Sequence, residues 1–198
     1  KTGIVLSISE KLDNLISFFG LGLKPSSSSD PFALRRQAFG LMKIIIKNQL
    51  TIPLRDLIAQ CIQFFPECIQ KKRDVLVDEI IAFIIPRVRS HFIDEGFLKG
   101  EIDACLSIRN DDLFDVYSRV NTLHHFRKQN ESFPSLVQVH KRSCGQTANF
   151  ERCTLNKGLC TEAAEIALYD ALQQRKEPFN SYIKAHQYEQ ALMLISQL

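Results

Sequence analysis

Residues 30–48 read DPFALRRQAFGLMKIIIKN, and this stretch decides how the chain folds. Asp30 is a good N-cap acceptor and Pro31 suits the first position of a helix, so the pattern predicts a helix from Pro31 to about Asn48. Apolar side chains recur along it at helical spacing, and the cations lie largely elsewhere. The apolar stripe comprises Phe32, Phe39, Met42, Ile45 and Ile46, and the cations are Arg35, Arg36, Lys43 and Lys47.

Further helical patterns lie on both sides of this stretch. Residues 6–19 have helical periodicity and end at a Gly-Leu-Gly breaker, and a serine-rich linker follows them. Gly96 is typical of a helix C-terminus, and Pro86 is expected to kink the helix that precedes it. No alternating, strand-like segment is found, so the sequence predicts an all-α fold with breaks near residues 22–29, 51, 96 and 156–158. The remaining helices are expected over residues 53–65, 74–95, 101–107, 111–127, 132–142, 161–174 and 188–198.

The composition is that of an ordinary globular protein. Hydrophobic residues make up 45% of the 198 residues and charged residues make up 24%. Apolar runs such as Ile80–Ile85 are far shorter than the roughly 20 residues that span a bilayer. The N-terminus lacks the basic, apolar and small-residue pattern of a signal peptide. We therefore expect a cytoplasmic protein with no membrane segment.

The cysteine and histidine patterns do not predict a metal or nucleophilic site. The six cysteines include no CxxC pair, so reduced and mostly buried thiols are expected. Cys144 follows two cations, but no arrangement of a histidine with an orienting group is evident beside it. His124 and His125 are adjacent on a predicted helix and point about 100° apart, so we expect one buried and one surface histidine.

Several blocks of sequence resemble a known family. Residues 10–15 read EKLDNL, with Phe18-Phe19 after them, and residues 29–36 read SDPFALRR. These blocks resemble A-D-K-L-D-T-L and G-S-K-D-P-F-A-L-R-R in the β subunit, or β-like half, of bacterial-type glycyl-tRNA synthetase. Residues 87–96 with Ile102-Asp103-Ala104, and residues 164–172, also resemble that family. The resemblance extends over nearly the whole chain.

The resemblance implies a domain organisation. Residues 1–24 are expected to be the last helix of an HD-like domain, residues 25–30 a linker and residues 31–130 a helical body. Residues 131–198 are expected to be a partial DALR-like anticodon-binding region, truncated at its C-terminus, within a helical bundle array. An HD-type metal site needs His and His-Asp residues that this chain lacks, so Glu10 is predicted to be a solvated helix residue and no metal site is expected.

The same resemblance implies a function. In the family the α subunit activates glycine with ATP and Mg²⁺, and the β subunit is needed for productive tRNA binding. Glycine tRNA and the α subunit, or a fused α half, are therefore the expected partners. No glycine-rich phosphate loop is present, so no catalytic residue and no cofactor are expected in this chain. Two alternatives remain: an all-helical protein-interaction scaffold with no RNA role, and part of an HD-type phosphohydrolase.

RNA contacts would have to come from local basic clusters, because the net charge is only +3. Phosphate contacts need cations but no fixed motif. The alternative is a solvated charge run, or for Arg35 and Arg36 an ion pair with Asp13 or Asp56. The candidate RNA-binding residues are Arg35, Arg36, Lys71, Lys72, Arg73, Arg87, Arg89, His140, Lys141 and Arg142. Candidates for stacking on unpaired bases are Tyr117, Tyr169, Tyr182 and Tyr188.

Overall fold

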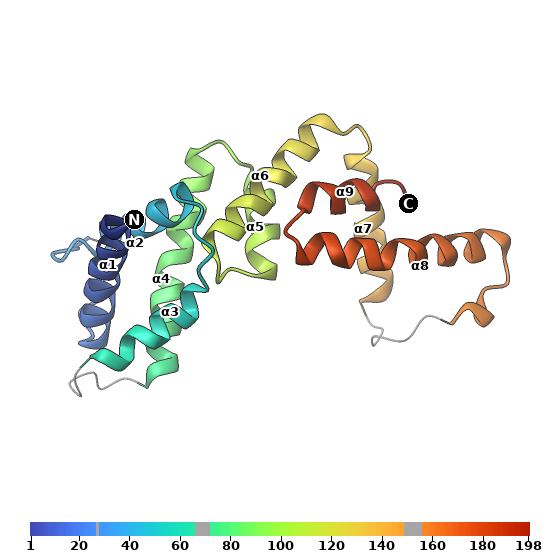
Figure 1. The fold of residues 1–198 in the computed structure, drawn as a ribbon. Helices are drawn as coiled ribbons and strands as arrows, with labels where there is room; N and C mark the ends of the chain where they lie inside the picture. Colours follow the sequence, from blue (N-terminus) through green and yellow to red (C-terminus); the bar gives the residue numbers. More distant parts are fainter. Residues whose placement is uncertain (27, 66–71, 149–155) are drawn as a thin grey trace. The chain divides into compact units, whose positions relative to one another are not determined.

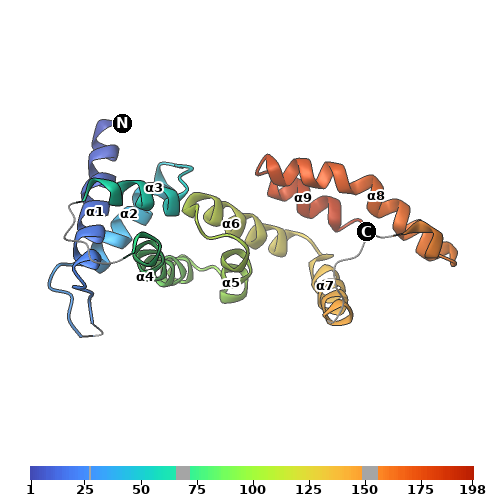
Figure 2. The same cartoon turned by 90° about the horizontal axis from the view of Figure 1, so that it is seen from below.

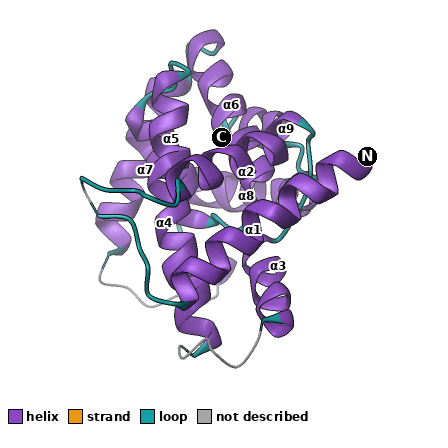
Figure 3. Cartoon of the chain, turned by 90° about the vertical axis from the view of Figure 1, so that its left-hand side faces the viewer, coloured by secondary structure: helices purple, strands orange, loops and turns teal. Residues whose placement is uncertain are grey.

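A computed structural model describes residues 1–26, 28–65, 72–148 and 156–198 of the chain. Within these residues every regular element is a helix and no strand occurs (Figure 3). The predicted all-α fold is confirmed. None of the described helices is both long and apolar enough to cross a membrane.

The helices form two compact units, Lys1–Asn121 and Thr122–Leu198, and the division falls inside helix α6 (Figure 1). The HD-like and DALR-like assignments of the expected domains stay predictions. The first unit holds α1 (Thr2–Gly20), α2 (Leu34–Lys47), α3 (Leu54–Cys61), the short 3-10 helix η1 (Ile62–Phe64), α4 (Arg73–Asp94), α5 (Lys99–Ile108) and the start of α6 (Leu113–Gln129). The second holds the end of α6, α7 (Phe133–Thr147), the 3-10 helix η2 (Lys157–Leu159), α8 (Ala163–Lys184) and α9 (Tyr188–Ile195).

The core of the first unit forms where α1, α2 and α4 pack on one another (Figure 2). Leu15, Leu41 and Ile84, one from each helix, are fully buried. Each such side chain contributes roughly 1.5–3 kcal/mol by leaving water. Phe19 meets the ring of Phe83 edge-on, with their centroids 5.0 Å apart, so aromatic packing joins α1 to α4. This packing fixes α2 against α4, which is where the candidate site lies.

Helix α2 begins at Leu34, so the prediction that Pro31 occupies the first helical position is wrong. Ala33 has φ +54°, which is left-handed, and its N–H donates to the carbonyl of Asp30 at 3.1 Å in a tight turn. Pro31 therefore belongs to this turn, whose φ it suits. Asp30 is therefore not the N-cap residue, which is Ala33, but its side chain still acts as the predicted acceptor for the first turn. Its carboxylate accepts the N–H groups of Leu34 at 2.8 Å and Arg35 at 3.0 Å.

Some of the other helix ends differ from expectation. Helix α8 runs ten residues beyond the predicted end at residue 174 and contains Pro178, because its second half packs against α9. Helix α7 extends from the predicted end at residue 142 to Thr147. The helix expected over residues 53–65 ends at Cys61 and continues as the 3-10 turn η1. Helix α4 continues across Pro86 and ends before Gly96, whose φ of +95° suits the predicted terminus.

The second unit buries little apolar surface in its described part. Phe126 and Ala191 are its only buried hydrophobic side chains among the described residues, and α7 and α8 contribute none. Helices α8 and α9 form a hairpin through a turn in which His186 has φ +56°. The amide of Asn130 lies 3.7 Å from the sulfur of Met193, which links the end of α6 to α9. Marginal burial of this kind predicts lower local stability than in the first unit.

Replacing Asp30 with alanine removes the side-chain cap of α2. The side chain is only 15% exposed, so the two backbone N–H groups that it binds would lose a partially buried acceptor. We expect a loss of about 1–2 kcal/mol in the free energy of unfolding, measured by urea titration. Asp13→Ala is the control, because Asp13 is exposed in the middle of α1. Equal stability of the two variants would contradict the capping role.

Candidate nucleic-acid interface

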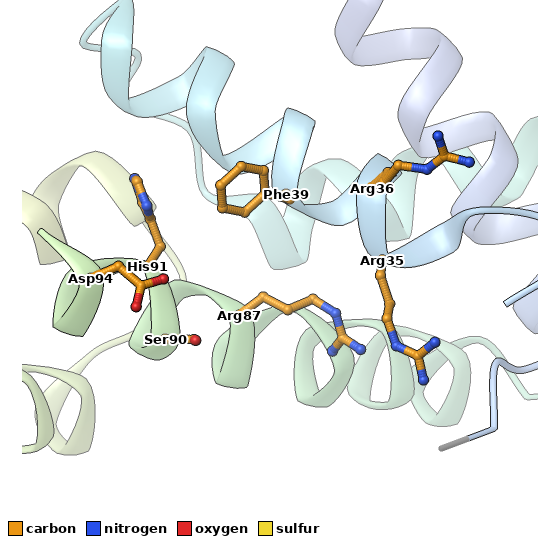
Figure 4. A pocket seen from close by; sticks show the side chains of 7 residues that line it. All are labelled: Arg35, Arg36, Phe39, Arg87, Ser90, His91 and Asp94. Atoms are coloured by element: carbon orange, nitrogen blue, oxygen red, sulfur yellow. The ribbon is translucent and has the colours of Figure 1, made fainter. Parts of the chain in front are cut away.

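A surface cleft of about 360 Å³ lies between α2 and α4 (Figure 4). It brings together three of the predicted RNA-binding residues, Arg35 and Arg36 from α2 and Arg87 from α4. The side chains that line it are Arg35, Arg36, Phe39, Arg87, Ser90, His91 and Asp94. Cations from two helices that are distant in sequence thus share one surface.

The side chain of Arg35, at the N-terminus of α2, is held by residues of the preceding loop. One terminal nitrogen donates to the carbonyl oxygen of Ser26, and the other lies 3.9 Å from a carboxylate oxygen of Asp30. Among the described residues it makes no ion pair with Asp13 or Asp56, so those predicted partners are wrong. Asp30 is the carboxylate that lies beside it, because the turn before α2 folds back over the first helical residues.

Arg87 approaches the same place from α4. Its guanidinium carbon lies 3.4 Å from the centroid of the Phe83 ring, and one terminal nitrogen donates to the carbonyl of Phe83. Its Nε atom is buried and has no hydrogen-bond partner in the described structure. Burial lowers the pKa of Arg87, the charge of Arg35 lowers it further, and the charge of Asp30 raises it. The side chain of Arg87 extends toward that of Arg35, and their guanidinium groups end on the same side of the cleft (Figure 4).

Arg36 does not join this pair. It is exposed, no ion pair is found for it within the described residues, and its guanidinium is turned away from those of Arg35 and Arg87 (Figure 4). Adjacent residues on a helix point about 100° apart, which explains the divergence. The sequence indicates an Arg35–Arg36 pair, whereas the structure couples Arg35 to Arg87. Nothing in the local sequence signals that tertiary pairing.

The other end of the cleft is aromatic and acidic. Phe39 is 37% exposed, although the sequence places it on the apolar stripe of α2. The ring of His91 meets it edge-on at 5.2 Å, and Lys43 lies 4.7 Å from its centroid. His91 Nε2 lies 3.2 Å from a carboxylate oxygen of Glu95, and Asp94 lines the same end of the cleft. The cleft is therefore polarised, with arginines at one end and carboxylates at the other.

The other candidate RNA-binding residues of unit 1 that the structure describes do not line this cleft. Arg89 makes an ion pair with Asp103 at 2.6 Å, which joins α4 to α5. Lys72 and Arg73 are exposed at the start of α4. Lys71 lies outside the described residues. Lys72 and Arg73 therefore present their charges to solvent, whereas the charge of Arg89 is paired with that of Asp103.

The basic residues of α7 are fully presented to solvent. His140, Lys141 and Arg142 are all exposed. The ring of His140 lies 3.6 Å from the sulfur of Cys144, and the i,i+4 spacing of these two residues on a helix is the sequence signal for that contact. No described side chain orients this imidazole, so the pair lacks the third member of a nucleophilic triad.

The four tyrosines differ in how much of each ring is available. Tyr117 is half-buried and lies between Phe92, at 5.7 Å, and Phe97, at 6.1 Å, so its ring is engaged in aromatic packing. The Tyr188 hydroxyl is 2.9 Å from His186 Nδ1, which ties it to the α8–α9 turn. Base stacking by Tyr169 and Tyr182 stays a prediction. Both are half-buried, and Lys157 Nζ lies 5.8 Å from the Tyr169 ring centroid.

The remaining titratable candidates are surface or partly buried residues. Glu10 is exposed and pairs with Lys11 at 3.1 Å, so its prediction as a solvated helix residue is confirmed. His124 is half-buried and His125 is exposed, so the expectation of one fully buried histidine is wrong. Over the described ranges, no group of three or more histidine, cysteine or acidic residues is placed to hold a metal ion.

The cysteines are less buried than predicted. Cys61, Cys105, Cys144 and Cys160 are free thiols, and of these four only Cys105 is buried. Burial raises the pKa of the Cys105 thiol to about 11. Cys68 and Cys153 lie outside the described residues.

These observations define an all-helical chain that presents cations in a cleft and on two exposed helical surfaces. The family of the glycyl-tRNA synthetase beta subunit matches residues 1–107. This part contains the cleft but not the basic residues of α7.

Curated relatives match the chain over nearly its whole length. The glycine–tRNA ligase beta subunit of Syntrophomonas wolfei is 35% identical over 197 residues, covering 99% of this chain and 28% of the relative. That of Clostridioides difficile is 32% identical over 191 residues, covering 96% and 27%. The chain belongs to the glycyl-tRNA synthetase beta-subunit family. It spans somewhat over a quarter of the length of these relatives.

Alkylation should distinguish the thiols. At pH 8 a thiol with a pKa of about 11 is ionised in about one molecule in a thousand, and Cys105 is also shielded from the reagent. We expect iodoacetamide to label the exposed Cys144 first and Cys105 last, as read by peptide mass spectrometry. In urea the two rates should converge. Equal rates in the folded protein would contradict the burial of Cys105.

Proposed function

We propose that this chain is a tRNA-recognition part of a glycine–tRNA ligase that acts in the cytoplasm. The observation that carries the proposal is membership of the beta-subunit family over residues 1–107, together with relatives that match nearly all of the chain. ATP-dependent attachment of glycine, with Mg²⁺, would take place on the α subunit or a fused α half. Glycine tRNA and that subunit are the proposed partners.

The distribution of charge supports a role in RNA binding. With a net charge of +3, the chain would attract RNA through local surfaces rather than over its whole area. Three such surfaces are available: the arginine end of the cleft, the start of α4, and the exposed face of α7. Each places guanidinium or ammonium groups where a phosphate can reach them.

The cleft lacks the features of a catalytic site for aminoacylation. Ser90 and His91 are adjacent on α4 and point about 100° apart, and His91 Nε2 already faces Glu95 at 3.2 Å. A nucleophile and its base must lie within hydrogen-bond reach of one another. The chain also has no glycine-rich loop to hold the phosphates of ATP. Binding and positioning of RNA is the role that these residues support.

A protein-interaction scaffold is the competing function. It is favoured by the exposed apolar side chains of α8, where Leu168 is 52% exposed and Ile183 is 41% exposed. Exposed apolar side chains mark protein interfaces where they form a contiguous patch. The two functions differ in one measurable property, because a scaffold has no salt-dependent affinity for RNA.

Replacing Lys71, Lys72 and Arg73 together with alanine should weaken binding of glycine tRNA in a filter-binding assay. The slope of log affinity against log salt should fall by roughly 0.7 to 0.9 for each phosphate that is no longer bound. Lys47→Ala, at an exposed position at the end of α2, is the control for removal of charge elsewhere. An unchanged slope in the triple variant would remove the start of α4 from the RNA surface. Absence of tRNA binding by the unmodified chain would favour the scaffold.

The purified chain should show no aminoacylation and no glycine-dependent exchange of pyrophosphate into ATP. The reason is the lack of an ATP-binding motif and of a catalytic arrangement in the cleft. The assay is run with and without added α subunit. Exchange above background in the absence of α subunit would overturn the division of labour proposed here.

A further inference from the structure

The arginine end of the cleft has more positive charge than its neighbours neutralise. Asp30 is the carboxylate that lies beside Arg35, and its charge also acts on Arg87. Both of its oxygens already accept backbone N–H groups, from Leu34 and Arg35. One carboxylate that is committed to a helix cap thus stands against two guanidinium groups, and a net charge of about +1 remains there.

Unused hydrogen-bond donors accompany this charge. A guanidinium carries five N–H donors in a planar fork. Arg35 uses one of them on Ser26, and Arg87 uses one on Phe83. The Nε group of Arg87 is buried and has no partner among the described residues, so the terminal nitrogens are the donors left for a ligand. Donors therefore remain on both side chains, whose guanidinium groups end on the same side of the cleft (Figure 4).

We propose that Arg35 and Arg87 together bind one phosphate group of an RNA backbone at the α2–α4 cleft. This inference rests on the proposed function for the source of the phosphate. Arg35 and Arg87 contact the anion, and Asp30 is a positioning residue that holds Arg35 in place. The sequence alone suggests the adjacent arginines as the pair, but Arg36 is turned away.

The anchoring of both side chains favours a specific contact over a diffuse one. Arg87 stacks on Phe83 at 3.4 Å, and Arg35 is held by the carbonyl of Ser26. Prior ordering lowers the conformational entropy lost on binding. Arginine forks that bind a phosphate from two helices would give the charge-assisted hydrogen bonds that phosphates prefer.

The far end of the cleft limits the ligand to a single phosphate. Asp94 lines that end, and Glu95 lies nearby, paired with His91 at 3.2 Å. A second phosphate placed there would meet carboxylate charge. Phe39, 37% exposed, separates the two ends and offers an apolar surface to the sugar or base that follows the phosphate. The polarity of the cleft thus suits one phosphodiester better than a nucleoside diphosphate or triphosphate.

The first test measures glycine tRNA binding by the full chain over a series of salt concentrations. Arg35→Gln and Arg87→Gln should each lower affinity by about tenfold, the effect of one charged hydrogen bond. Each should also reduce the salt slope by about 0.7 to 0.9. Because both arginines hold the same phosphate, the double variant should lose no more slope than either single variant. Additive reductions in slope would mean two separate phosphates and would overturn the shared site.

Two further variants separate binding from folding. Arg87→Lys keeps the charge but not the fork, so it should retain the melting temperature and still bind less tightly. Lys47→Gln removes one exposed charge from α2, outside the cleft, and should change affinity less than twofold. Equal reductions in affinity for Lys47→Gln and Arg87→Gln would show an effect of net charge alone and would overturn the proposal.

The second test uses inorganic phosphate and does not depend on tRNA. At constant ionic strength, replacing chloride with phosphate should raise the melting temperature of the unmodified chain, and this rise should be absent in both Arg35→Gln and Arg87→Gln. Absence of any phosphate effect, with unchanged tRNA affinity in both arginine variants, overturns the cleft site while the proposed function stands. A phosphate effect that needs both arginines, in a chain that does not bind tRNA, supports the anion site and overturns RNA as its source.

Discussion

The carboxylate of Asp30 is the interaction on which the site in the first unit depends. It accepts the N–H groups of Leu34 and Arg35 and so fixes where α2 begins. It also lies 3.9 Å from the guanidinium of Arg35 and so fixes where that charge is presented. A single side chain thus ends a loop, starts a helix and contributes a negative charge to the cleft. In this arrangement Ala33 adopts a left-handed conformation, with φ +54°, which is unfavourable for a residue other than glycine.

Packing of α1, α2 and α4 supplies the second requirement, because it brings Arg87 to Arg35. The fully buried side chains of these helices, such as Leu41 and Ile84, hold α2 against α4 with little freedom to shift. Arg87 then lies across the ring of Phe83, half-buried, with its Nε unsatisfied. A buried donor without a partner and a like-charged neighbour are both unfavourable for folding alone. Such local costs are typical of positions that serve binding.

The two units differ in how many apolar side chains they bury among the described residues. The first has a continuous apolar core and carries the cleft, and the family match over residues 1–107 falls within it. The second presents its cations on α7, a helix with no buried residue, and leaves apolar side chains of α8 exposed. This contrast separates two kinds of contact. A preformed cleft can select one phosphate by geometry, whereas an exposed basic helix attracts RNA mainly by charge.

The sequence by itself determined the helical class, the Asp30 cap, the Gly96 terminus and the family, because periodicity, capping and motif blocks are encoded locally. It also pointed to Arg35 and Arg87 as separate candidates. Only the tertiary structure decided which cations lie together. Arg36 diverges from Arg35 by the helical rotation, Arg89 is taken by Asp103, and Arg87 reaches Arg35 across a helix interface. The extension of α8 past residue 174 was likewise decided by packing against α9. Local signals locate the helices, but burial against a neighbouring helix decides which side chains meet and, for α8, how far the helix extends.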